Sequence, residues 1–192
     1  ENMGRLLAKL EALEILDETV FIFLTDNGPN GSRFNDGMRG WKSSVDEGGV
    51  RVPLFVRWPE RIRAGTVVKP NVAHIDLLPT LSRIAGVENL KKKTLPLDWM
   101  DVTPLLFGQD DFEMPERNLF VWSKPQKWSV RTSRYRATET MLHDLIADPG
   151  QKENLARKLP EIHGELIEAY RRWAAEATDE EPALLPIPIG YE

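Results

Sequence analysis

The chain has 192 residues, of which 41% are hydrophobic and 29% charged, with a net charge of −5. This composition supplies a substantial core for one domain, or for one domain with an appendage. The acidic balance argues against a nucleic-acid partner, and no apolar run approaches the ~20 residues that span a bilayer. The lack of cysteine excludes disulfides, thiolate metal sites and a cysteine nucleophile in this chain.

The first part of the chain predicts helices alternating with strands. Apolar residues recur every three or four positions over residues 3–13, which is typical of an amphipathic helix. Residues 20–24, VFIFL, are apolar without alternation, which favours a strand covered on both faces, as in a parallel sheet. A second strand is expected over 52–58, and a helix over 76–84 that ends at Gly86.

The later part of the chain predicts a small antiparallel sheet and a helix. Prolines punctuate an irregular crossing first. Short strands are then expected over 119–123, 128–132 and 135–138, joined as a meander. One apolar stripe over 159–177 predicts a last helix, and the proline-rich residues 180–192 predict an extended tail.

Asp26 and Asn27 directly follow the first predicted strand and precede a Gly-Pro pair. One interpretation is a simple turn, because Asn-Gly accepts positive φ readily. The other is a ligand site, because open α/β sheets bind ligands at the carboxyl ends of their strands. Carboxylate and amide oxygens are hard donors that suit Ca²⁺ or Mg²⁺, although Ca²⁺ takes about six to eight oxygens and needs further ligands.

Residues 38–53 read MRGWKSSVDEGGVRVP and form a second candidate region. The stretch can be a glycine-rich surface loop in which Lys42 and Arg51 are ordinary solvated charges. Alternatively, a lysine near a bound cation serves a purpose if both face one anion, such as a sulfate or phosphate ester. The residues alone leave both interpretations open.

The two regions together resemble the sulfatase family, within the alkaline phosphatase-like superfamily. TDNGP is followed by GWKSSVDEGGVRVPLFVRWP, and then by HIDLLPTLSRIAG, WSVRTSRYR and LHDLIADPGQKENLA, in the family's order. The resemblance implies an α/β fold: the C-terminal part of an alkaline phosphatase-like sheet with flanking helices over residues 1–110. Over residues 111–192 it implies a small antiparallel sheet packed with a C-terminal helix.

The resemblance also implies roles for individual residues. Asp26 and Asn27 match the family's metal-ligand pair, which helps to hold a divalent cation, commonly Ca²⁺. Lys42 matches the lysine that contacts the sulfate and its bridging oxygen and stabilises charge on the leaving group. Glu47 and Arg51 match positions that we expect to support the loop.

The family's nucleophile is a formylglycine, matured from Cys or Ser in a Cys/Ser-x-Pro/Ala-x-Arg motif, and no such motif occurs in this sequence. The chain is therefore expected to be the C-terminal portion of a sulfatase, with no nucleophile of its own and inert by itself. In the complete enzyme the resemblance implies a sulfated formylglycine hydrate that releases sulfate by elimination. Ser43 stands where the family commonly has glycine.

The expected substrate is a sulfate ester, either a small molecule or a glycan. The family is usually exported, which implies a periplasmic, secreted or lysosomal location. We also expect oligomerisation through the exposed sheet of a truncated domain. Two alternatives stay open: a non-catalytic binding or assembly module, and a related hydrolase of phosphate or phosphonate monoesters.

The histidines and tryptophans are weaker candidates. His74 precedes the helix at 76–84 and is a weak substrate-binding candidate, for which a structural or surface role weighs more. His143 is expected to pack in the core and His163 to face solvent. Trp122 and Trp128 either line a substrate pocket or form the core of the small sheet.

Overall fold

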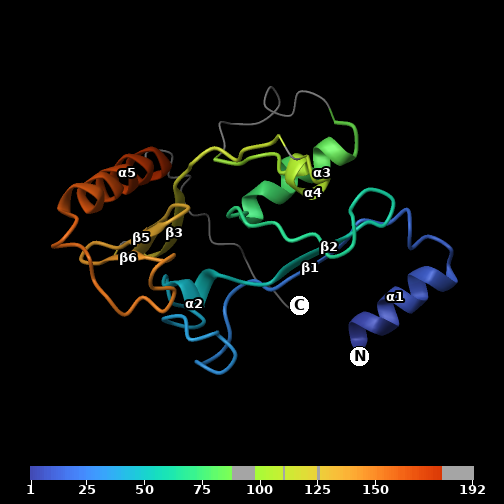
Figure 1. The fold of residues 1–192 in the computed structure, drawn as a ribbon, viewed down its shortest axis with the longest axis horizontal. Coiled ribbons are helices and arrows are strands. Elements are labelled where there is room, and N and C mark those ends of the chain that lie inside the picture. The colour runs from blue at the N-terminus through green and yellow to red at the C-terminus, as the bar shows by residue number, and fades with distance from the viewer. Residues whose placement is uncertain (88–97, 110, 125, 179–192) are drawn as a thin grey trace, which may run out of the picture. The chain divides into compact units, whose positions relative to one another are not determined.

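The computed structural model describes residues 1–87, 98–109, 111–124 and 126–178. Helices and strands alternate in the first part, and an antiparallel sheet and a long helix follow (Figure 1). The chain forms two compact units. The first unit comprises residues 1–26 and 52–116, and the second comprises residues 27–51 and 117–192.

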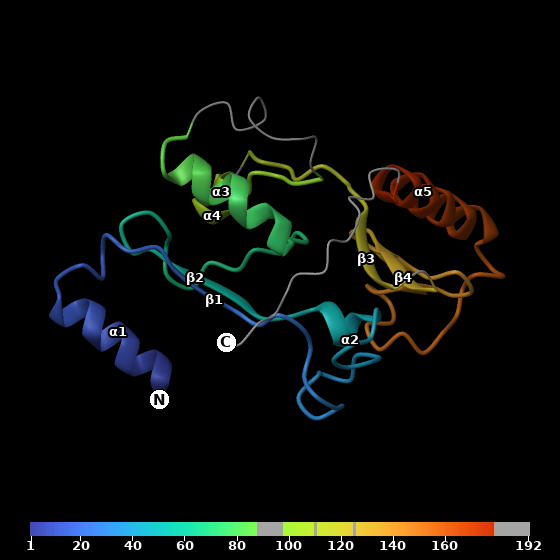
Figure 2. The same ribbon diagram turned by 180° about the vertical axis from the view of Figure 1, so that it is seen from behind.

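The sheet of the first unit is a ribbon of two strands, β1 (Phe21–Leu24) and β2 (Leu54–Arg57). They run antiparallel, with Phe21 opposite Arg57 and Leu24 opposite Leu54 (Figure 2). The prediction of a parallel strand buried on both faces is therefore wrong for the described residues, because Leu24 is 38% exposed. An apolar run without alternation does not reveal the direction of its neighbour.

The helical part of the first unit begins at η1 (His74–Asp76), a 3₁₀ turn that leads into α3 (Leu77–Ile84). The buried Asp76 carboxylate accepts hydrogen bonds from the backbone N–H groups of Ala73 at 2.8 Å and Met100 at 2.9 Å. The expected helix is confirmed, and it ends before Gly86, whose φ is +76°.

Two further helices complete the first unit. The helix α4 (Thr103–Leu106) was not predicted. The residue before it, Val102, donates its N–H to Thr80 Oγ1 at 3.0 Å. The predicted amphipathic helix is α1 (Asn2–Ala12), and none of its residues is buried. No helix of the described residues has both the length and the apolar character needed to cross a membrane.

The sheet of the second unit is a four-stranded antiparallel meander. Its strands, in both chain and spatial order, are β3 (Leu119–Lys124), β4 (Lys127–Arg131), β5 (Tyr135–Ala137) and β6 (Leu142–Asp144). The three predicted strands are confirmed, and β6 is an addition. The remaining helix before this sheet is the single turn α2 (Glu47–Val50).

The predicted last helix is α5 (Pro160–Thr178), which covers one face of this sheet (Figure 1). Trp128 stacks on Tyr170 with ring centroids 3.7 Å apart, so Trp128 is a core residue. Trp122 is 55% exposed. His163 Nε2 lies 2.9 Å from the Thr138 carbonyl oxygen and the residue is half-buried, so the prediction that it faces solvent is wrong.

Two expectations fall outside the described residues. They are the start of the irregular crossing, over residues 88–97, and the extended tail, over residues 180–192. The described part of the crossing includes α4, so it is more regular than its prolines suggest.

Candidate active site

Gly28 and Pro29, which directly follow Asp26 and Asn27, are joined by backbone hydrogen bonds to the loop that carries Lys42. The Gly28 N–H donates to the Gly49 carbonyl at 2.9 Å, and the Lys42 N–H donates to the Pro29 carbonyl at the same distance. Two motifs that are separate in the sequence therefore form one local structure, which positions the backbone of Lys42 beside the turn.

Glycine is required at this junction because the backbones approach too closely for a side chain. A Cβ atom on Gly28 would overlap the Gly48 carbonyl group, and its distance from the carbonyl carbon would be 2.9 Å. A Cβ atom on Gly48 would lie 2.8 Å from the Arg39 carbonyl oxygen. Real side chains avoid such distances, so these glycines determine how tightly the turn and the loop pack.

The loop has its own internal support. The buried Asn35 side chain donates to the carbonyls of Met38 and Gly40, at 2.7 and 3.0 Å. The Ser44 hydroxyl donates to the Asp46 carboxylate at 2.6 Å. Ser43 has a φ of +70°, the left-handed conformation that suits glycine, which agrees with its place at a position where the family commonly has glycine.

The predicted site residues differ in exposure. Lys42, Asp26 and His74 are exposed, and Asn27 is half-buried. Asn27 and Lys42 belong to the second unit, whereas Asp26 and His74 belong to the first, where His74 begins η1. A substrate-binding role for His74 stays a prediction.

The oxygens of Asp26 and Asn27 have the chemistry that a hard divalent cation prefers. They are too few to complete a site, since Ca²⁺ takes about six to eight oxygens. Among the described residues, no group of three or more His, Asp or Glu side chains is placed to hold a metal ion. The pair therefore fits part of a cation site.

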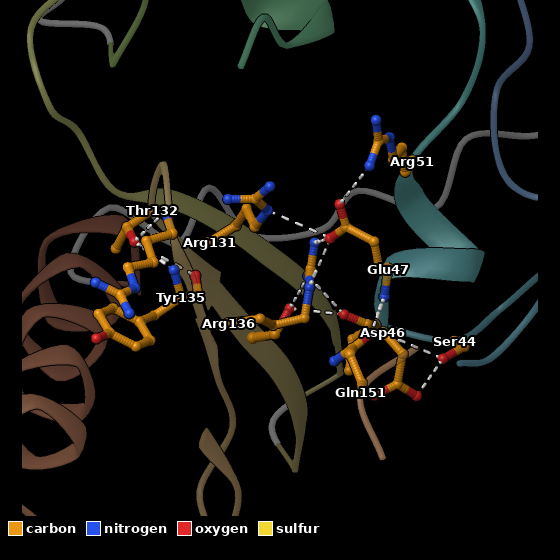
Figure 3. A network of polar contacts seen from close by, with 12 residues as sticks. Ser44, Asp46, Glu47, Arg51, Arg131, Thr132, Tyr135, Arg136 and Gln151 are labelled. Atoms are coloured by element: carbon orange, nitrogen blue, oxygen red, sulfur yellow. Dashed lines mark hydrogen bonds and ion pairs between the residues drawn. The ribbon is translucent and has the colours of Figure 1, made fainter. Parts of the chain in front are cut away.

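Glu47, at the start of α2, lies at the centre of a buried ionic cluster (Figure 3). Arg136 on β5 donates to Glu47 Oε2 from Nε at 3.2 Å and from Nη2 at 2.7 Å. Arg131 on β4 donates to the same oxygen from Nε at 3.3 Å. Arg51, one turn after Glu47, lies 3.8 Å from the other carboxylate oxygen.

Arg136 also bonds the backbone before Glu47. Its Nη1 donates to the Val45 carbonyl at 2.8 Å and to the Ser129 hydroxyl at 2.7 Å. Ser129 in turn donates to the same Val45 carbonyl at 2.7 Å. One guanidinium thus holds both the carboxylate and the main chain of the loop, a geometry that the planar fork of arginine allows and a lysine does not.

The charges in this cluster stabilise each other. Burial opposes the ionised form of Glu47, but the combined charges and hydrogen bonds of Arg136 and Arg131 outweigh burial and lower the pKa of the carboxyl below its ordinary value. Burial lowers the pKa of Arg136, and the Glu47 carboxylate opposes that effect. Glu47 is therefore ionised in the folded protein at neutral pH.

Gln151 completes the cluster from the loop after β6. Its Oε1 accepts a hydrogen bond from the Glu47 N–H at 2.7 Å, and the side chain is buried. Gln151 has a φ of +54°, in a turn where its N–H donates to the Asp148 carbonyl at 3.0 Å. The resemblance to the sulfatase family pointed to Glu47 as a support of the loop, but it did not reveal Arg136 or Gln151 as its partners.

His143 packs beside this region as expected. It is 2% exposed, and its Nδ1 lies 2.7 Å from the Glu153 carbonyl oxygen. Burial lowers its pKa, more than the hydrogen bond to Glu153 raises it. The neutral imidazole is therefore the favoured form, with Nδ1–H as the donor.

Comparison with known proteins identifies the family. The Sulfatase family model matches residues 1–87. Arylsulfatase A of Bos taurus is 30% identical over 207 residues, which cover 88% of this chain and 40% of that protein. Steryl-sulfatase of Mus musculus is 39% identical over 117 residues, which cover 56% of this chain and 18% of that protein.

A solved structure shows the same fold at lower identity. Ps i-CgsB, crystallised in complex with k-i-k-neocarrahexaose, aligns with a TM-score of 0.76 and 21% identity, over 89% of this chain and 40% of that one. The described helices and antiparallel sheets agree with the predicted α/β class. The chain belongs to the sulfatase family, has the fold of the corresponding part of an alkaline phosphatase-like protein, and spans about 40% of the length of arylsulfatase A.

Proposed function

We propose that this chain forms part of the active site of a sulfuric ester hydrolase. The observation that carries the proposal is the backbone junction between Gly28-Pro29, which directly follow Asp26 and Asn27, and the Lys42 loop, through the bonds Gly28 to Gly49 and Lys42 to Pro29. A cation-binding turn and an anion-binding lysine must lie close together if they serve one ester.

Each residue has a distinct task in this proposal. Asp26 and Asn27 supply oxygens to a divalent cation, which when bound neutralises charge on the ester's sulfate oxygens. The Lys42 ammonium approaches the bridging oxygen and stabilises the negative charge that develops there as the bond to sulfur breaks. The leaving alcohol departs more readily because this charge is partly neutralised.

The remaining parts of a working site are assigned to residues outside this sequence. The nucleophile and the other cation ligands lie elsewhere in the natural protein, as the resemblance implies. The substrate is a sulfate ester of a small molecule or glycan, and the location is extracytoplasmic. These proposals rest on the similarity to arylsulfatase A and steryl-sulfatase, of which the chain covers 40% and 18%.

The reaction is tested by measuring product release by the natural protein that carries this chain. Substituted phenyl sulfates, phenyl phosphates and phenyl phosphonates are compared at equal concentration, with and without a chelator of divalent cations. The proposal predicts the highest kcat/KM for the sulfate esters, and a loss of turnover with the chelator. Preference for a phosphate or phosphonate ester would overturn the proposal and favour the related hydrolase.

A second candidate is a non-catalytic assembly module. It is favoured by the large apolar side chains exposed on the first unit, among them Leu6 at 48% and Phe55 at 65% exposed. Such residues suit contact with another protein surface. A natural protein that is folded and oligomeric in sedimentation, yet releases neither sulfate nor phosphate, would support this candidate instead.

A further inference from the structure

The loop that carries Lys42 is held by residues of the antiparallel sheet and by the loop that follows β6. Glu47 lies five positions after Lys42, and the hydrogen bonds that reach it come from β4, β5 and the turn at Gln151 (Figure 3). All of these contacts lie within the second unit.

We infer that Arg136 and Gln151 are positioning residues that fix the Lys42 loop in the geometry needed for ester cleavage. The inference rests on the proposed function of Lys42, and it goes further by assigning a role in that function to the antiparallel sheet. Arg136 does not touch the substrate in this account; it acts through Glu47 and Val45.

The Arg136 guanidinium makes hydrogen bonds with all three of its nitrogen atoms. The Arg136 side chain is 2% exposed, and its Nε, Nη1 and Nη2 atoms all donate, to Glu47, Val45 and Ser129. Burial of a full charge is costly unless it is paired and hydrogen-bonded. A well-packed apolar residue is an alternative at such a position, so the retention of a polar cluster agrees with a need for one fixed loop geometry.

A short stretch of chain connects this cluster to the candidate site. Val45 and Glu47, which are held by Arg136, lie between Lys42 and the Gly48-Gly49 pair. Gly48 packs against Arg39 and Gly40, and Gly49 accepts the hydrogen bond from Gly28. A displacement of Glu47 is therefore expected to move both the part of the loop that carries Lys42 and the contact of Gly49 with Gly28.

Gln151 holds Glu47 independently of Arg136. Its Oε1 accepts the Glu47 N–H at 2.7 Å, so the first residue of α2 is fixed through its main chain as well as its carboxylate. A helix of one turn has little intrinsic stability, because nucleation costs more than its few hydrogen bonds return. The geometry of α2 thus depends on these tertiary contacts.

The test uses the natural protein with Arg136→Lys, which keeps the positive charge but cannot reach Glu47, Val45 and Ser129 together. The matched control is Arg134→Lys, the same change two positions earlier, at an exposed arginine whose Nε and Nη2 donate to Asp144. Hydrogen exchange of the backbone amides over residues 38–51 reports the loop. The kinetics of a series of substituted phenyl sulfates report the chemistry.

We expect Arg136→Lys to increase amide exchange over residues 38–51 by about tenfold to a hundredfold, since hydrogen bonds to a charged group are lost. Exchange in α5 should stay the same. We expect kcat to fall by at least about tenfold with little change in KM, and to depend more steeply on the pKa of the leaving phenol, as Lys42→Ala should also show. Arg134→Lys should change none of these quantities.

A double variant separates positioning from general stability. If Arg136 acts through Lys42, the double variant Lys42→Ala/Arg136→Lys should be slower than Lys42→Ala by less than about threefold. In Lys42→Ala the side chain that Arg136 helps to position is already absent, so the second change has little further effect on kcat. Full additivity of the two losses, equal exchange increases in α5 and the loop, or unchanged loop exchange would each overturn the inference.

Two further measurements keep the result interpretable. If Arg136→Lys does not fold, Gln151→Met removes only the acceptor of the Glu47 N–H, and the same loop-specific exchange and leaving-group dependence are expected from it. If Lys42→Ala retains full turnover, the proposed function fails, while the exchange measurement still decides whether Arg136 holds the loop.

Discussion

Glu47 and Arg136 are 89 positions apart in the sequence, yet the guanidinium Nη2 and the carboxylate Oε2 are 2.7 Å apart and both side chains are buried. This pair connects the glycine-rich loop of the candidate active site to the antiparallel sheet. Together with the bonds from Ser129 to Val45 and from Glu47 to Gln151, it links residues 27–51 to residues 117–192, with which they form one compact unit.

Replacement of Glu47 by glutamine should destabilise the second unit strongly. Glu47→Gln keeps the size of the side chain but leaves the Arg136 charge buried without a counter-charge, a loss of about 3–5 kcal/mol in the free energy of unfolding. Urea unfolding measures this loss of free energy. The control Glu153→Gln breaks an exposed pair with Lys158 and should change that free energy by less than about 1 kcal/mol. Equal effects of the two changes would contradict the buried ion pair.

His143 should make the stability of the second unit depend on pH. Burial lowers its pKa in the folded state below the ordinary value of 6.5, so the folded state favours the neutral form and the unfolded state binds more protons. The stabilisation is complete above about pH 6.5 and is lost as the pH falls towards the folded-state pKa. The urea midpoint should decline from pH 7.5 to pH 5.

The variant His143→Asn retains a donor near the Nδ1 position without a titrating ring, so its urea midpoint should decline less over this pH range. His74→Asn, at an exposed histidine, should follow the parent protein. A His143→Asn variant with the same pH dependence as the parent protein would show that His143 contributes none of it.

A methyl group at Gly28 should disrupt the junction of the two motifs. In Gly28→Ala the new Cβ overlaps the Gly48 carbonyl, which belongs to rigid backbone, so the turn and the loop must separate. The matched control is Gly164→Ala on α5, where nothing lies within 4 Å of the new Cβ and the change should raise helix stability by about 0.5–1 kcal/mol. In urea unfolding, Gly28→Ala should lower the free energy of unfolding and Gly164→Ala should raise it. An unchanged free energy of unfolding in Gly28→Ala would contradict the close packing.

Asp26 and Asn27 should contribute to a measurable cation affinity of the natural protein. A cation that binds only the folded state stabilises it by about 2.7 kcal/mol at a concentration of 100 Kd. Added Ca²⁺ should therefore raise the Tm of the parent protein, and raise it much less in Asp26→Ala or Asn27→Ala. Asp111→Ala, at an exposed carboxylate, is the control. A full Ca²⁺ response in the first two variants would remove these residues from the ligand set.

The elements of the fold were predictable where they depend on local pattern. The apolar stripes gave α1 and α5, and the short apolar runs bounded by polar residues gave β2 and the strands of the meander. The direction of the neighbour of β1 was not predictable, because the run VFIFL carries no information about its partner. Two short elements, α4 and β6, were missed because three or four residues show no clear period.

The candidate site was predictable in its residue types but not in its supports. The motifs point to Asp26, Asn27 and Lys42, and the roles of these residues stay predictions. Arg136 is a charged residue in a strand of three residues, and nothing in so short a segment predicts that its side chain is buried. Its partner lies across 89 positions, and the sequence offers no local signal for a contact of that range.

The most direct test of the whole account is the turnover of a phenyl sulfate by the natural protein with Lys42→Ala, compared with Lys152→Ala at another exposed lysine. If Lys42 stabilises charge on the leaving oxygen, kcat should fall by about 100-fold to 1,000-fold in Lys42→Ala, most for the poorest leaving groups, and stay unchanged in Lys152→Ala. An unchanged kcat in Lys42→Ala would exclude this lysine from the chemistry and contradict the proposed site.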